Sequence, residues 1–182
     1  MLIVRQLDKL EFVELLEALE SVEVYMKDIQ FNGGNKRFNC RVNGICIKDN
    51  KIFLSKLKND DYWTFVGGKV EFGESTDFAI LREYKEEVGV DLQVDKLLAL
   101  IENFFELRGD SWHQYIFFYQ LRDDNNALEF FEGEREVEDS KNAIYRWFDL
   151  DEITNVPIKP DCSREILKNI SHNIQHYINR DN

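Results

Sequence analysis

One segment near the middle of the chain constrains the fold more than any other, because it carries both a start and a stop signal for a helix. Ser75 or Thr76 can cap the N-terminus of this helix. Asp77 falls in its first turn, where a negative charge is favourable. Gly89 supplies the stop after about Val88. The sequence therefore predicts an α-helix over residues 76–88.

Short runs rich in β-branched and aromatic residues flank this helix. Before it, residues 38–47 and 51–56 predict a hairpin around an Asp49-Asn50 turn. Further strands are predicted at residues 62–66, 91–107, 112–122, 127–131 and 142–149, with a turn at 108–110. A C-terminal helix is predicted from isoleucines at every fourth position, namely Ile166, Ile170, Ile174 and Ile178. Together these elements predict the α/β class, a mixed sheet with helices packed on its faces.

The first residues differ in character from the rest of the chain. Residues 8–21 have the periodicity of an amphipathic helix, and the turn cluster at 32–35 precedes the β-rich part. The chain is therefore divided into an N-terminal helical extension, 1–35, and a main domain, 36–182. The apolar stripe of the extension could pack on its own domain or mediate a homodimer, and the sequence leaves both open.

The charge balance argues against some partners. The chain of 182 residues has 35 acidic and 23 basic side chains, a formal net charge of −12. Such a protein repels nucleic acids and anionic lipid surfaces, so neither partner is expected. No signal peptide or membrane span is apparent, and three cysteines follow no disulfide or metal spacing. A cytoplasmic location is expected, and handling of phosphates would require a bound cation.

The predicted helix carries an acidic face. Glu83, Glu86 and Glu87 fall within an arc of roughly 100°. The opposite, apolar face is expected to be formed by Leu81, Tyr84, Val88 and, less centrally, Phe78. Clustered oxygen ligands favour Mg²⁺, Mn²⁺ or Ca²⁺. Helix periodicity alone, however, favours an ordinary solvated acidic face.

The sequence upstream of these glutamates makes the pattern specific. From Gly68 to Val90 the chain reads GKVEFGESTDFAILREYKEEVGV. This resembles the Nudix box, whose fixed positions are matched by Gly68, Glu74, Arg82, Glu83, Glu86, Glu87 and Gly89. Two positions depart from the family pattern: Tyr84 replaces an aliphatic residue, and Val66 stands where many relatives have proline. Neither change removes an oxygen ligand.

The resemblance implies a Nudix-type α/β/α sandwich that holds Mg²⁺, with Mn²⁺ as an alternative. By this resemblance Glu86 and Glu87 are metal ligands, and Glu83 is a ligand or the base that deprotonates water. The carbonyl of Gly67 is expected as a further ligand, because paired glycines allow close chain approach. The box residues expected to support the site are Gly68, Glu74 and Arg82. Glu71 could add an acceptor or be a plain exposed residue.

The activity implied is hydrolysis of a phosphoanhydride bond in a nucleoside di- or triphosphate or a related nucleoside diphosphate derivative. Several aromatic side chains could border the substrate cleft and stack on a base, although strand packing explains each of them singly. They are Trp63, Phe65, Tyr115, Trp112 and His113. A further acidic residue could come from Glu132, Glu134, Glu136 or Glu138. The alternatives are a catalytically silent nucleotide-sensing domain and a protein-interaction module.

Overall fold

The computed structural model describes residues 27–131, 133–137, 142–170 and 173–181. The amphipathic helix predicted at 8–21 lies outside these residues, as do Glu132 and Glu138. A role for the N-terminal helix in dimerisation therefore stays a prediction. In the described ranges no helix is both long enough and apolar enough to cross a membrane.

The described strands form one mixed sheet in the order β7-β8-β3-β2-β6-β5-β9, with β1 and β4 also paired to β2. The bounds are β1 Gln30–Gly33, β2 Lys36–Lys48, β3 Lys51–Leu57, β4 Gly67–Lys69, β5 Gln93–Leu107, β6 Asp110–Arg122, β7 Arg135–Glu136, β8 Ala143–Asp149 and β9 Gln175–Arg180. β2 runs parallel to β6 and β5 runs parallel to β9, whereas the other pairs along this order are antiparallel. The mixed sheet confirms the predicted fold class.

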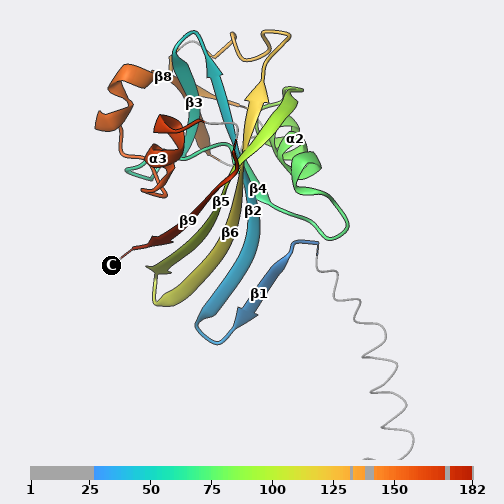
Figure 1. The fold of residues 1–182 in the computed structure, drawn as a ribbon, viewed down its shortest axis with the longest axis vertical. Helices are drawn as coiled ribbons and strands as arrows, with labels where there is room; N and C mark the ends of the chain where they lie inside the picture. Colours follow the sequence, from blue (N-terminus) through green and yellow to red (C-terminus); the bar gives the residue numbers. More distant parts are fainter. Residues whose placement is uncertain (1–26, 132, 138–141, 171–172, 182) are drawn as a thin grey trace, which may run out of the picture.

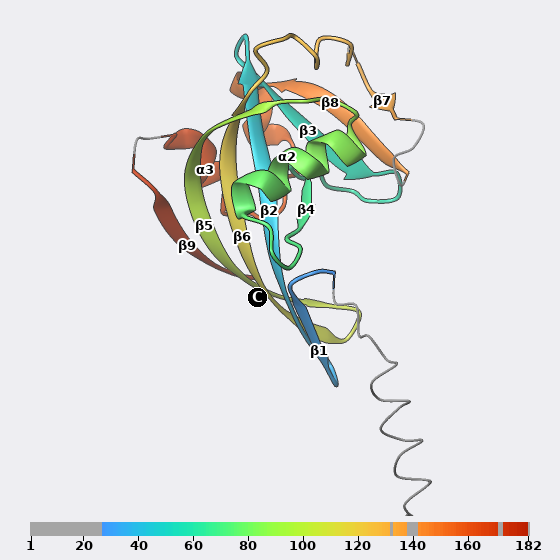
Figure 2. The same cartoon turned by 90° about the vertical axis from the view of Figure 1, so that its right-hand side faces the viewer.

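Helices cover both faces of the sheet (Figures 1 and 2). Helix α2, Thr76–Glu87, lies across β2 and β4 on one face. The 3-10 helix η1, Leu150–Asn155, and helix α3, Ser163–Lys168, lie on the other. Each face has its own apolar cluster, one including Ile80 and Tyr84 of α2 and the other Ile166 of α3. The layers thus form an α/β/α sandwich.

Several local predictions are confirmed. The β2–β3 hairpin turns at Asp49 and Asn50, which both have positive φ. α2 ends before Gly89, whose φ of 79° lies in the left-handed region. The turn cluster at 32–35 lies within the β1–β2 hairpin, so the sheet begins at Gln30, upstream of the expected boundary.

Two of the predicted strands are wrong. Residues 62–66 form only isolated bridges, Trp63 to Ile158 and Thr64 to Ser55. Residues 127–131 are mainly turns, because the carboxylate of Asp123 accepts hydrogen bonds from two backbone amides there, at 2.8 and 2.9 Å. In both places apolar residues are buried without strand geometry, which a β-rich composition cannot distinguish from a strand.

The long C-terminal helix is also wrong. α3 ends at Lys168, and the chain then enters β9, which pairs in parallel with β5. Ile166 is buried, but Ile174 and Ile178 are 63% and 60% exposed. β9 supplies the hydrogen-bond partners that this edge of β5 lacks, and tertiary pairing therefore overrides the four-residue periodicity.

Candidate active site

The orientation of α2 is fixed by close packing on β2. Its buried residues are Ala79, Ile80, Glu83 and Tyr84, whereas Phe78, expected on the apolar face, is 61% exposed. The Tyr84 ring fits because Gly44 has no side chain: a Cβ there would lie 2.5 Å from the ring. The Tyr84 hydroxyl donates to the Gly44 carbonyl at 3.4 Å. The departure from the box at position 84 therefore has a partner in the core.

Arg82 ties the box loop to the helix. It donates to both carboxylate oxygens of Glu74, at 3.1 and 2.8 Å, and to the backbone carbonyl of Lys69 at 3.0 Å. The same carboxylate accepts from the backbone amide of Glu71 at 2.7 Å. Burial raises the pKa of Glu74, but these hydrogen bonds outweigh it and the net pKa is lowered. A bidentate pair of this kind sets both distance and angle.

Glu83 is held beneath the loop. It is 9% exposed and accepts a hydrogen bond from Arg82 Nη1 at 2.9 Å. A Cβ at Gly68 would lie 2.3 Å from the Glu83 carboxylate, so only glycine leaves room for it. Burial raises the pKa of Glu83, against the opposing effect of Arg82. A carboxylate of raised proton affinity suits a base that takes a proton from water.

Gly67, the residue before Gly68, lets the backbone pass close to β2. Gly67 has a φ of 154°, and a Cβ on it would lie 2.1 Å from the Val42 carbonyl. The Gly67 carbonyl accepts a hydrogen bond from Arg41 Nη2 at 3.4 Å. Burial lowers the pKa of Arg41, while Glu83 and Glu87 oppose that shift. Sequence reasoning missed Arg41, whose only signal is that it shares a β2 face with Asn43.

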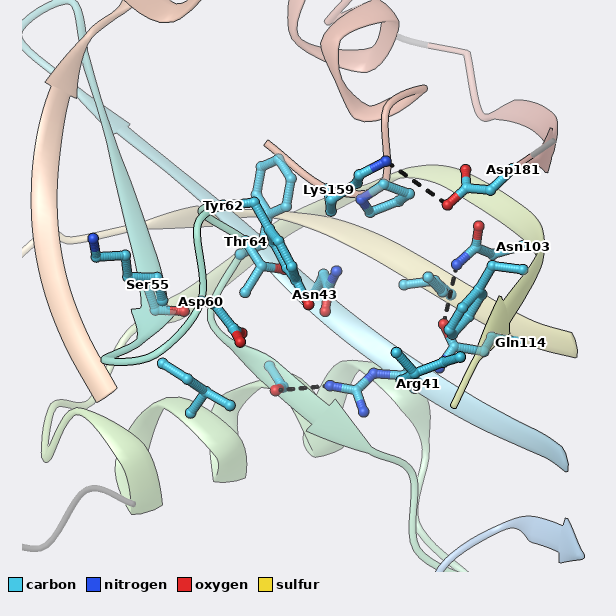
Figure 3. Close-up of a pocket in the computed structure, with 18 of the residues that line it drawn as sticks. Arg41, Asn43, Ser55, Asp60, Tyr62, Thr64, Asn103, Gln114, Lys159 and Asp181 are labelled. Carbon is cyan, nitrogen blue, oxygen red and sulfur yellow. Dashed lines mark hydrogen bonds and ion pairs between the residues drawn. The ribbon is translucent and has the colours of Figure 1, made fainter. Parts of the chain in front are cut away.

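A cavity of about 480 Å³ opens beside these groups (Figure 3). Gly67, Glu87 and Arg41 line one part of it. The rest is lined by side chains from the sheet and by the loops around residues 60–64 and 159–160. The cavity therefore joins the box to a chamber large enough for a small organic molecule.

Three of the aromatic residues predicted near the substrate lie in different environments. Phe65 is buried but lines the cavity. Trp63 does not line it and packs against Phe148, with ring centroids 4.7 Å apart. Tyr115 contacts Phe38 and His113 on the opposite sheet face, because neighbouring Gln114 and Ile116 face the cavity. Only Phe65 of the three is placed to touch a molecule in this cavity.

The oxygen donors of the box fit a hard divalent cation in kind. Glu83, Glu87 and the Gly67 carbonyl offer the oxygen donors that such a cation prefers, and Arg41 and Arg82 already donate hydrogen bonds to two of these groups. Glu86 is 54% exposed and pairs with Arg82 at 3.1 Å. Among the residues that the structure describes, no group of three Asp, Glu, His or Cys side chains lies close enough together to hold a metal ion. A metal held by these glutamates would therefore require their side chains to come closer together.

The acidic loop residues that can be placed do not join the site. Glu134 pairs with Arg146 at 3.3 Å and Glu136 with Lys58 at 2.6 Å, and neither lines the cavity. Their positive partners lie on or just after strands β8 and β3. Both glutamates therefore pair with basic side chains at the protein surface and not with groups of the site.

Comparison with known proteins supports the same family. A sequence model described as the NUDIX domain matches residues 40–170. The chain is 45% identical over 62 residues to "ADP-ribose pyrophosphatase" of Methanocaldococcus jannaschii, covering 32% of this chain and 37% of that protein. It is 32% identical over 97 residues to "8-oxo-dGTP diphosphatase" of Proteus vulgaris, covering 51% and 83% respectively.

The match with curated relatives is not always full-length: for two of them it spans only 66% and 37% of their length. The crystal structure of a MutT protein from Bacillus halodurans shares the fold, with a TM-score of 0.52 and 23% identity, covering 77% of this chain and 90% of that one. The family match spans the loop, the glutamate helix and the cavity wall described above. The chain therefore belongs to the Nudix hydrolase family.

Proposed function

We propose that the protein hydrolyses a phosphoanhydride bond in a nucleoside di- or triphosphate, or in a related nucleoside diphosphate derivative, and that it requires Mg²⁺. The observation that carries this proposal is the position of the box. Glu87 and the Gly67 carbonyl line a 480 Å³ cavity beside Arg41, with Glu83 held just behind them. Negative donors for a cation and a positive donor for phosphate thus meet at one end of a chamber.

The cation would be held by Glu83, Glu86, Glu87 and the Gly67 carbonyl, where it offsets phosphate charge and lowers the pKa of water. Manganese has the same preference for oxygen donors. Arg41 is placed to donate to a phosphate oxygen in the cavity, in place of its long bond to Gly67. Arg82, Glu74 and Gly68 hold the donors in position.

In the reaction, the water oxygen forms a bond to phosphorus and the bridging P–O bond breaks. Glu83 accepts the proton from the water, for which its raised pKa is suited. The bridging oxygen leaves with the second phosphate-containing part, and the first part is a nucleoside monophosphate when the attack is on the α-phosphorus. Two relatives named as a pyrophosphatase and a diphosphatase are consistent with this bond class.

The experiment is a panel of nucleoside triphosphates and nucleotide sugars, assayed with Mg²⁺, with Mn²⁺ and with chelator. Glu86→Gln and Glu87→Gln are measured on the best substrate, with circular dichroism to confirm folding. We expect turnover that needs metal and falls at least about tenfold in each variant. Folded variants that hydrolyse as fast as the parent would contradict the metal assignment. Tight nucleotide binding without turnover would instead indicate the sensing domain.

A further inference from the structure

A row of side-chain amides that the proposed reaction does not use crosses the sheet, and two of its members, Asn103 and Gln114, line the cavity. The row has one residue on each of four adjacent strands: Asn39 on β2, Gln114 on β6, Asn103 on β5 and Asn179 on β9. Their Cα atoms pair as Asn39 with Gln114, Gln114 with Asn103, and Asn103 with Asn179. Since side chains of paired residues share a face, the row crosses the sheet on one side.

A carboxylate at one end fixes the direction of the hydrogen bonds in this row. Asn179 Nδ2 donates to Asp181 Oδ1 at 3.0 Å and to Asn103 Oδ1 at 2.7 Å. Asn103 Nδ2 then donates to Gln114 Oε1 at 3.1 Å (Figure 3). Because a carboxylate can only accept, Asp181 determines which end of each amide faces its neighbour.

The direction of these hydrogen bonds determines which end of the Gln114 amide is free, and Gln114 lines the cavity together with Asn103. Its oxygen is used by Asn103, so its NH₂ group is the free end. Among the described residues Gln114 Nε2 has no acceptor in hydrogen-bond contact, whereas the neighbouring Asn39 Oδ1 is buried without a partner. One N–H of Gln114 can turn to this orphan oxygen and the other to the cavity.

The row lies at a useful distance from the reacting end. Gly67 pairs with Asn43, and Arg41 lies between Asn43 and Asn39 on β2, so along the strand the row is roughly 13 Å from Gly67 and roughly 7 Å from Arg41. A nucleoside with its first phosphate spans such a distance. Beyond the row, Phe105 also lines the cavity and stacks on Trp112, with ring centroids 5.8 Å apart and planes 8° from parallel. An aromatic wall beside an amide donor is what a base requires.

We infer that Gln114 reads a keto group on the base of the nucleotide, so that the enzyme prefers 4-oxopyrimidine and 6-oxopurine nucleotides over their amino counterparts. This inference rests on the proposed function, because it places the phosphates at Arg41 and the base at the amide row. An amide N–H can donate to a ring carbonyl but not to an exocyclic amino group. With an amino base, the exocyclic amino group and the Gln114 N–H would both be donors and could not form a hydrogen bond.

The test uses pairs of nucleotides that differ in this edge alone. Calorimetric binding of UMP against CMP, and of IMP against AMP, needs no turnover and therefore stands apart from the metal-dependent activity. Hydrolysis of UTP against CTP, and of ITP against ATP, gives the ratio of kcat/KM. We expect the keto member of each pair to be favoured about tenfold or more. Equal binding within each pair, a preference for CMP and AMP, or no binding of any of the four would overturn the inference.

Two variants assign the preference to the row. Gln114→Glu keeps the acceptor for Asn103 but presents a second acceptor to the cavity, so the ratio should invert toward CMP and AMP. Asp181→Asn removes the group that fixes the direction of the row, so the ratio should shrink by about threefold or more. Asp124→Asn is the matched control, a half-exposed carboxylate that pairs with Arg122 at 3.5 Å and does not line the cavity, and it should keep the parent ratio. A parent ratio retained in Gln114→Glu would contradict the role of the row even if the enzyme hydrolyses every nucleotide normally.

Discussion

The two ends of the cavity are built in different ways. At the reacting end, the contacts join residues of one stretch of chain, namely Gly68, Glu74, Arg82 and Glu83. At the other end, four amides from strands β2, β5, β6 and β9 meet through sheet register alone. The first arrangement is held by contacts within one segment of chain, whereas the second is held by hydrogen bonds passed between strands that are distant in sequence. The proposed chemistry therefore depends on one segment of the chain, and the proposed recognition of the base depends on the assembled sheet.

The largest effect is expected at the reacting end. Glu83→Gln keeps the shape and the bond from Arg82 but removes the charge and the base. We expect kcat to fall by about 10³-fold with folding retained, because general-base catalysis alone contributes 10²–10⁴-fold. Steady-state kinetics in saturating Mg²⁺ measures this. A fall below about tenfold would mean that another group takes the proton.

A slightly smaller effect is expected from crowding the same carboxylate. Gly68→Ala would place a Cβ 2.3 Å from the Glu83 carboxylate and push it out of position, so kcat should fall about 10²-fold. Gly73→Ala, in the same loop, is the matched control. Its φ of 86° makes the change costly for stability, but nothing lies within 4 Å of the new Cβ. Equal losses of kcat in the two folded variants would show that loop strain, and not the Glu83 carboxylate, controls the rate.

Arg82→Lys tests the scaffold that joins the loop to the helix. Lysine keeps the charge but cannot donate two bonds to Glu74 and one to the Lys69 carbonyl at once. We expect half-activation to need about tenfold more Mg²⁺, because groups that position metal ligands typically affect affinity by 10–100-fold. The measurement is a Mg²⁺ titration of initial rate. Lys85→Arg, on an exposed helix position, should leave the titration unchanged.

The same contrast explains what the sequence could predict. The Arg82–Glu74 pair was predictable because both residues and their spacing lie within the segment that resembles the Nudix box. The placement of Phe78 could not be derived from helical periodicity, since burial on α2 depends on Gly44 and on the strand beneath. Likewise, strand β9 forms because it pairs with the open edge of β5, and the spacing of the isoleucines carries no information about that edge.

The substrate end was harder to predict for a related reason. Trp63 and Tyr115 are aromatic residues close in sequence to cavity residues, but strand alternation and loop geometry turn them away from it. Arg41 and Gln114 reach the cavity by the same alternation. Which face of β2 or β6 looks into the cavity depends on where η1, α3 and the loops lie. That arrangement becomes visible only in the assembled fold.

The smallest effect is therefore expected at the recognition end, and it should appear in KM. Phe105→Ala removes an aromatic wall of the cavity, so KM should rise about fivefold, the equivalent of ~1 kcal/mol of stacking, with kcat unchanged. Tyr115→Ala, on the opposite sheet face, should leave both constants unchanged. If Tyr115→Ala raised KM and Phe105→Ala did not, the base would lie on the other side of β6. The assignment of base binding to one end of the cavity and catalysis to the other would then be wrong. A fall in kcat for Phe105→Ala would instead mean that stacking also sets the position of the phosphates, so that the two ends act as one.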